Sequence, residues 1–320
     1  MKELSITYLT SENNNPPRVR VSRIDASGIQ PKTAEVNFNF QIAYNERRDI
    51  QWYLEESLEC PWGEFRNRAE RIEKEMQEIG SRLFNAVFGT GAAARVYSPV
   101  SDELGNTKIV IHASDPTGIA IPWELMRDPE LVNGGLAHLA HSFVRSQSDL
   151  KNPAVSLPKS DTLNILMVIC RPGGPDGDIA FQSVARPLLE IFRDHHDCIN
   201  LDVLRPPTFE QLSRVLEEKL NYYHVLHFDG HGAFPKRGKG YSTLFLGKDG
   251  QQGRLLFETD NDGRREVTGS ELGELLARAG VPIVLLNACQ SGMTHPESAF
   301  PSVGNQLLQA GARGVVAMTY

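Results

Sequence analysis

Two reactive side chains each follow a strand-like apolar segment, and together they could act as a thiol nucleophile and its base. His231 follows residues 222–228 and stands between two glycines, and Cys289 follows residues 283–287. A cysteine attacks a carbonyl carbon as the thiolate, and a neighbouring histidine favours that form. The pattern indicates nucleophilic catalysis, provided that the two strands end side by side.

The backbone beside these residues could complete such a site. The N–H groups of Cys289 and Gly232 are predicted to form an oxyanion hole for the developing negative charge. On placement alone, a buried cysteine and a structural histidine are the plainer interpretation, because free cysteine is among the most buried residue types.

A second interpretation is a metal site, because His227, Asp229 and His231 alternate along the chain. Residues at i, i+2 and i+4 of a strand share one face, and both residue types bind zinc. No fourth ligand is evident, and the two glycines favour a turn. We therefore predict a packing or supporting role for His227, and neither a metal nor a cofactor. The glycine-rich segments 171–178 and 89–94 do not match phosphate-binding motifs.

The sequence of the second half of the chain predicts the strands and helices that must position His231 and Cys289. Strands are predicted at residues 163–170, 199–204, 222–228, 283–287 and 313–320, and helices near residues 181–193, 208–220, 268–280 and 303–310. This alternation predicts an α/β fold with a mostly parallel sheet and helices on both faces. A hairpin is expected between residues 242–246 and 254–258. Sites in such sheets lie at the carboxyl ends of strands, where both residues fall.

The first half of the chain has a different character. Strands are predicted near residues 19–24, 36–40 and 108–112. Between them, apolar residues recur every three or four positions from Phe65 to Val87, which indicates a helix with one core-facing stripe. Segment 148–161 contains two prolines and is the predicted linker. We expect an accessory α+β region over 1–150 and the α/β core over 160–320.

The composition excludes several classes of function. With 33 Lys and Arg against 40 Asp and Glu, the net charge of −7 argues against nucleic-acid binding. The apolar runs are too short to cross a membrane. The four cysteines form no CxxC pair, which favours a reducing compartment. We expect a cytoplasmic protein without direct nucleic-acid or membrane contacts.

Two segments carry a family resemblance: residues 222–232 (YYHVLHFDGHG) and residues 283–292 (IVLLNACQSG). They closely resemble the paired motifs of CHAT domains, which are caspase-like bacterial cysteine peptidases related to separases and caspases. Weaker similarity extends over residues 163–171, 205–212 and 304–320, and upstream over residues 49–56 and 121–125. The resemblance implies a caspase-like fold in which His231 is the general base and Cys289 the nucleophile.

The resemblance also implies substrate-binding residues. In the wider superfamily, the position two residues before the nucleophile lines the pocket for the residue that precedes the cut. Asn287 holds that position here, and Arg171 and Asp229 are further candidates. For Arg171, an ordinary surface salt bridge fits equally well.

The function that the resemblance implies is regulated proteolysis by a His–Cys dyad in bacterial defence or signalling. Its substrate would be an effector or regulatory protein, such as a gasdermin-type pore former, and a sensor domain or partner protein would activate it. The alternatives are a catalytically degenerate CHAT scaffold or interaction module, and a metal-dependent hydrolase. CHAT domains usually continue beyond the strand at residues 315–320. We therefore expect the core to be incomplete at its C-terminus, with that sheet edge covered by further chain, another subunit or a partner.

Overall fold

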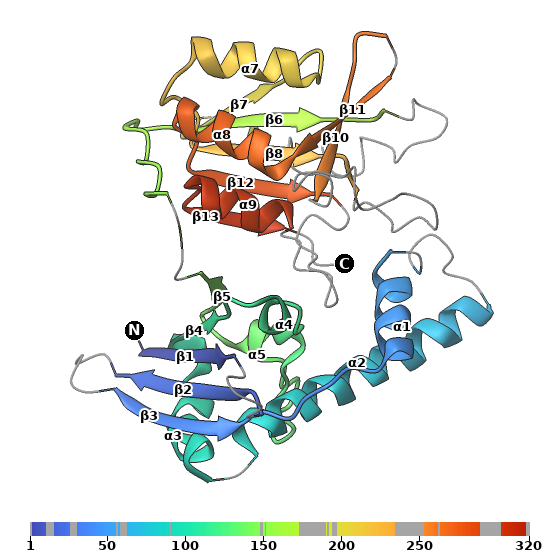
Figure 1. Ribbon diagram of the computed structural model, residues 1–320, viewed down its shortest axis with the longest axis vertical. Coiled ribbons are helices and arrows are strands. Elements are labelled where there is room, and N and C mark those ends of the chain that lie inside the picture. The colour runs from blue at the N-terminus through green and yellow to red at the C-terminus, as the bar shows by residue number, and fades with distance from the viewer. Residues whose placement is uncertain are drawn as a thin grey trace. The chain divides into compact units, whose positions relative to one another are not determined.

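The computed structural model describes most of the chain, in two compact units, Met1–Asp149 and Leu150–Tyr320 (Figure 1). The described residues are 2–10, 16–25, 31–55, 57, 63–89, 91–147, 150, 152–172, 190, 192–193, 197–233, 253–261, 263–288 and 302–317.

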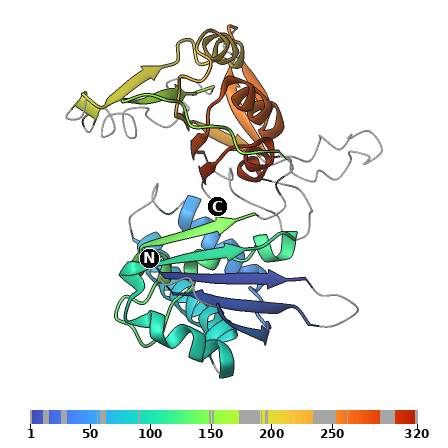
Figure 2. The same cartoon turned by 90° about the vertical axis from the view of Figure 1, so that its left-hand side faces the viewer.

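The first unit is built on a five-stranded sheet in the order β3-β2-β1-β4-β5 (Figure 2). Its strands are β1 (Lys2–Leu9), β2 (Arg18–Ile24), β3 (Lys32–Asn37), β4 (Thr107–His112) and β5 (Ser142–Ser146). Its helices are α1 (Tyr44–Glu55), α2 (Glu64–Phe88), α3 (Gly91–Ser101), α4 (Pro116–Ile119) and α5 (Leu136–Leu139), with short 3₁₀ turns at η1 (Leu104–Asn106) and η2 (Trp123–Leu125). Strand β1 runs antiparallel to β2 and parallel to β4, so the sheet is mixed.

Helix α2 follows the predicted apolar stripe over part of its length. Ile79 and Leu83 are buried and Leu83 joins the core against the sheet, but Phe65 is 48% exposed. Phe65 instead stacks on Trp52 of α1. The predicted strand over residues 36–40 also ends early, since β3 stops at Asn37 and Phe38 packs into the core as a loop residue.

The second unit contains a five-stranded parallel sheet in the order β13-β12-β8-β6-β7. Its strands are β6 (Leu163–Ile169), β7 (Ile199–Val203), β8 (Val225–Asp229), β12 (Ile283–Asn287) and β13 (Gly314–Ala317), and its described helices are α7 (Phe209–Glu218), α8 (Gly269–Ala279) and α9 (Val303–Ala310). A smaller antiparallel sheet has the order β11-β10-β9, from β9 (His231–Ala233), β10 (Arg254–Glu258) and β11 (Arg264–Thr268). The parallel sheet with its flanking helices confirms the predicted caspase-like α/β class. The three described helices pack on one face of the sheet, so the presence of helices on both faces stays a prediction.

One face of the parallel sheet forms the main core of this unit. Side chains of α7, α8 and α9 pack with alternate residues of the strands, among them Val168, Phe228 and Leu286. The intervening residues Met167, His227 and Asp229 point to the opposite face and are also buried. The strand period of two therefore separates an apolar face from a face that carries polar groups.

Side-chain caps begin two of the helices of the second unit. The Thr268 hydroxyl accepts a hydrogen bond from the Glu271 N–H, and the Glu271 carboxylate reaches back to Thr268, so a full capping box begins α8. At α7, the Thr208 hydroxyl accepts from the Gln211 N–H. Helix α8 ends at Gly280, whose φ of 75° favours glycine.

Two further predictions have different outcomes. The last strand, predicted over residues 313–320, is present as β13 and lies beside β12. The expected hairpin is wrong in its pairing, because β10 pairs with β11 on one side and with β9 on the other. Residues 242–246, its proposed partner, and most of the helix predicted near residues 181–193 lie outside the described residues.

Candidate active site

The strands that precede the two predicted catalytic residues are direct neighbours. Asn287 at the end of β12 lies opposite Asp229 at the end of β8. The Gly230 N–H donates to the Asn287 carbonyl oxygen across a distance of 3.1 Å. The condition that the two strands end side by side is thus met. Cys289 itself lies outside the described residues, two positions after Asn287.

His231 sits immediately beyond a tight turn. A Cβ atom at Gly230 would lie 3.1 Å from the Cys170 carbonyl oxygen and 3.0 Å from the Phe228 ring, so the turn leaves little space for a side chain. After this glycine, His231 enters β9 and lies opposite Leu256 of β10. Gly232, the predicted oxyanion residue, lies opposite Leu255.

The three predicted substrate-binding residues form one polar cluster at the strand ends. Asn287 Nδ2 donates to one carboxylate oxygen of Asp229 across 2.9 Å, and Arg171 donates to the other across 2.7 Å. The side chains of Arg171 and Asp229 are 13% and 4% exposed. Their polar atoms are therefore largely engaged with one another. This favours a salt bridge for Arg171, but the pair is buried and not at the surface as predicted.

Glu258 belongs to the same cluster and was not predicted. Its carboxylate accepts a hydrogen bond of 2.7 Å from the backbone N–H of Arg171. It lies at the end of β10, two residues beyond the partner of His231. Nothing in its local sequence marks it, because the contact depends on how two separate sheets meet.

His227 is buried and lies two residues before Asp229 on the same face of β8. Burial lowers the pKa of His227, and the nearby charge of Asp229 opposes this shift only in part. The side chain is therefore neutral near pH 7. It is 9% exposed, which suits the predicted packing role.

The metal interpretation has no geometric support in the described part of the chain. Strand β8 ends at Asp229, so His231 is on a different strand from His227 and the three residues do not share one strand face. Among the described residues, which include all three, no group of three or more His, Cys, Asp or Glu side chains could hold a metal ion.

Two of the four cysteines are described, and neither suits a nucleophile at this site. Burial raises the pKa of the Cys170 thiol to about 12, and the thiol donates to the Pro207 carbonyl oxygen. Cys198 is exposed, but its carbonyl accepts from the Leu163 N–H at the amino end of the sheet. Cys60, like Cys289, lies outside the described residues.

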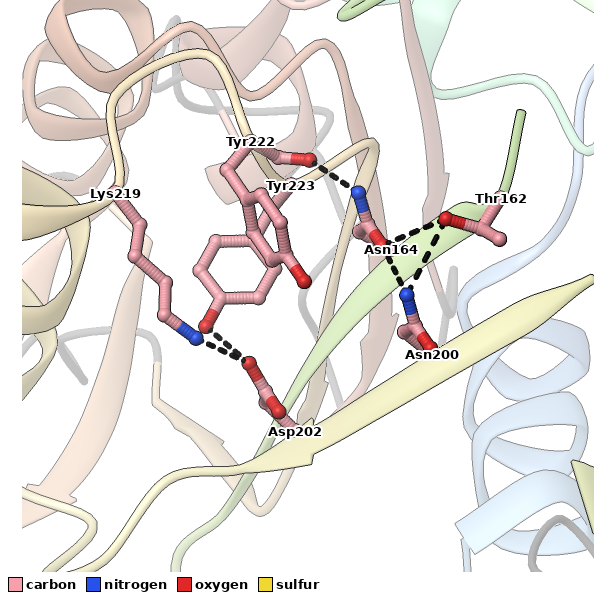
Figure 3. A network of polar contacts seen from close by, with 7 residues as sticks. All are labelled: Thr162, Asn164, Asn200, Asp202, Lys219, Tyr222 and Tyr223. Carbon is pink, nitrogen blue, oxygen red and sulfur yellow. Dashed lines mark hydrogen bonds and ion pairs between the residues drawn. The ribbon is translucent and has the colours of Figure 1, made fainter. Parts of the chain in front are cut away.

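A second polar network lies on the edge strand β7 (Figure 3). One carboxylate oxygen of Asp202 accepts from Lys219 across 2.7 Å and from the Tyr223 hydroxyl across 2.6 Å. The hydrogen bond from Lys219, followed by that from Tyr223, lowers the pKa of Asp202. Burial raises the pKa of Tyr223 to about 12, and its bond to Asp202 adds to this.

The same figure shows a set of neutral contacts near the amino ends of the strands. Asn164 Nδ2 donates to the Tyr222 carbonyl oxygen, and Asn200 Nδ2 donates to Asn164 Oδ1. These contacts join β6, β7 and the segment that precedes β8. They lie at the opposite end of the sheet from His231, so we assign them a structural role.

Comparison with known proteins identifies one family. A family model described as "CHAT domain" matches residues 77–320, which is more than half of the chain. The match begins inside α2, so it includes much of the first unit as well as the whole of the second. No curated protein matches the chain. No helix in the described parts of the chain has the length and apolar character needed to span a bilayer.

Proposed function

Because the chain belongs to the CHAT family, whose members are generally associated with caspase-like cysteine peptidases, we propose that it is a cysteine endopeptidase acting through His231 and Cys289. Cys289 attacks the carbonyl carbon of a peptide bond and forms an acyl-enzyme. His231 takes the thiol proton and delivers it to the leaving amine. Water then hydrolyses the acyl-enzyme.

The observation that carries this proposal is the hydrogen-bonded contact between the ends of β8 and β12. Gly230, bonded to the carbonyl of Asn287, precedes His231 directly, and Cys289 follows Asn287 by two positions. A parallel sheet brings these chain segments together although 58 positions separate the two residues. The properties of Cys170 and Cys198 support Cys289 as the nucleophile.

The substrate and regulation belong to the same proposal. We propose a protein substrate of effector or regulatory type, with a sensor domain or partner protein as activator, in bacterial defence or signalling in the cytoplasm. The resemblance of residues 222–232 and 283–292 to CHAT motifs supports this role. Contact between substrate and Asn287 is retained as part of the proposal, since its amide lies at the carboxyl end of β12.

The test compares the wild-type chain with Cys289→Ala and His231→Ala in a proteome-wide screen for new cleavage termini. We expect both variants to lose the cleavages of the wild type, each by as much as the double variant, because the two residues serve one proton-transfer unit. Cys198→Ala is the matched control and should retain activity.

Three results would point to another function. Near-normal turnover by His231→Ala would show that His231 is not the base of a catalytic dyad. Absence of any cleavage by the wild type, together with a Cys289 thiol no more reactive than that of Cys198, would favour the catalytically degenerate scaffold. Loss of activity on chelation, with recovery on adding zinc, would favour a metal-dependent hydrolase.

A further inference from the structure

Arg171 links the ends of two strands of the parallel sheet. Its guanidinium donates to the carbonyl oxygens of Cys170 and Asp229, each across 2.9 Å, and to the Asp229 carboxylate across 2.7 Å. The planar fork of an arginine can serve several acceptors at fixed angles, whereas a lysine ammonium acts as a compact charge. The contacts therefore depend on the shape of this side chain as well as its charge.

Asp229 extends the link to the next strand. The carboxylate oxygen that does not face Arg171 accepts from Asn287 Nδ2, and the backbone of Gly230 is bonded to Asn287 as well. The ends of β6, β8 and β12 are thus joined side by side through one carboxylate. Two of these ends lead directly to His231 and Cys289.

Glu258 joins the small sheet to the same cluster. Its carboxylate accepts from the Arg171 backbone N–H, and its strand pairs with β9, which contains His231. The ion pair is therefore hydrogen-bonded on one side to Asn287 of β12, which leads to the predicted nucleophile, and on the other side to Glu258 of β10, the strand that pairs with β9.

We infer that Arg171 and Asp229 are positioning residues, which fix the end of β12 relative to β8 and so set the distance between Cys289 and His231. This inference rests on the proposed function. It replaces the predicted substrate contacts of Arg171 and Asp229, because their polar atoms already satisfy each other. A displacement of about 1 Å in a reacting group can lower a rate roughly 100-fold, so a loosened strand end is sufficient to impair the dyad.

The experiment measures the rate at which iodoacetamide alkylates Cys289 as a function of pH. The reference chain carries Cys60→Ala and Cys198→Ala, which leaves the buried Cys170 as the only other thiol. In this reference, His231 should lower the apparent pKa of the Cys289 thiol below the value of about 8.5 for a free cysteine. Arg171→Lys and Asp229→Asn should slow alkylation at pH 7 by about 10- to 100-fold and return the pH profile towards that of a free thiol.

Further variants distinguish an effect on the position of the dyad from an effect on the stability of the fold. Arg171→Met combined with Asp229→Leu removes both charges, and should recover stability without recovering the fast alkylation. Lys219→Met breaks an exposed ion pair of the same length and should leave both the rate and the pH profile unchanged.

The outcomes distinguish this inference from the proposed function. If His231→Ala has no effect on the reactivity of Cys289, the dyad is wrong and the inference falls with it. If the reactivity depends on His231 but is unchanged in Arg171→Lys and Asp229→Asn, or returns fully in the double variant, the dyad stands and the positioning role is overturned.

Discussion

The second unit contains two ion pairs of equal length in very different surroundings. Arg171 and Asp229 lie 2.7 Å apart with side chains 13% and 4% exposed, while Lys219 and Asp202 lie 2.7 Å apart with side chains 44% and 43% exposed. An exposed pair is screened by water and typically stabilises a fold by less than about 1 kcal/mol. Loss of one partner from a buried pair lowers the stability of the fold much more, because the remaining charge stays buried where water does not solvate it. Burial therefore separates the two pairs where distance does not.

The two pairs also differ in what they join. The Lys219–Asp202 pair connects the end of α7 to an edge strand, and Tyr223 shares the same carboxylate. The Arg171–Asp229 pair connects the ends of central strands from which the predicted catalytic segments continue. Breaking the first should disturb the sheet edge, whereas breaking the second should disturb the site.

The largest expected effect comes from removing one member of the buried pair. Arg171→Met should lower the free energy of unfolding of the second unit by about 3–5 kcal/mol, because the Asp229 carboxylate is left buried without its cation. Urea unfolding should be followed by circular dichroism, since Trp52, Trp62 and Trp123 all lie in the first unit. In the double variant with Asp229→Leu, stability should return to near the wild-type value. If Arg171→Met lowers the free energy of unfolding by less than about 1 kcal/mol, the buried pair contributes no more than an exposed pair does.

An intermediate effect is expected from His227, which lies beneath the buried pair. Its folded pKa is lowered, so its contribution to stability is complete above the unfolded value of about 6.5 and is lost as the pH falls through that value towards the folded pKa. One proton changes stability by at most about 1.4 kcal/mol per pH unit. His227→Gln should therefore flatten the acid side of the stability curve. The exposed His138→Gln is the control, and an equal slope in both variants would contradict the assignment.

A smaller effect is expected from the exposed pair. Asp202→Asn should reduce stability at pH 7 by about 0.2–1 kcal/mol. The pKa of Asp202 is lowered in the fold, so its contribution is present above the unfolded value of about 3.9 and disappears as the pH falls through the folded pKa. The wild type and the variant should converge in acid. A difference that persists below both pKa values would show that charge is not its source.

The smallest effect should be the response to salt. Raising the ionic strength from 0.1 M to 1 M shortens the screening length from about 10 Å to about 3 Å. The difference between wild type and Asp202→Asn should shrink under these conditions, while the difference between wild type and Arg171→Met should change little. If urea unfolding shows that salt changes both stability differences equally, the two ion pairs do not differ in their exposure to solvent screening.

Local patterns in the sequence predicted much of the second unit. The strand β12, the helix near residues 268–280 and the last strand, predicted over residues 313–320 and observed as β13, were all identified from local sequence patterns. These features depend on residues a few positions apart, so the sequence specifies them directly. Phe65 was wrongly assigned to the buried stripe of α2, because the contact that determines its position is with α1 rather than with the sheet.

Predictions that depended on pairing between distant segments were less successful. The predicted partner of β10 was the segment at residues 242–246, but β11 and β9 pair with its two sides. The alternation of His227, Asp229 and His231 also allowed an alternative with all three residues on one strand face, although the two glycines favoured a turn. The structure has the turn at Gly230, and His231 lies in the smaller sheet. Alternation along a chain does not show where a strand leaves its sheet.

The sequence by itself determined the family, the order of the parallel strands and described helices of the second unit, and the candidates His231 and Cys289 at strand ends. Those features follow from residue types and from spacings within a single segment. Only the tertiary structure decided that Asp229 is shared between Arg171 and Asn287, and that Glu258 reaches the same cluster. The reason is physical: hydrogen bonds across strands are set by sheet order and register, which are fixed by the packing of the whole unit.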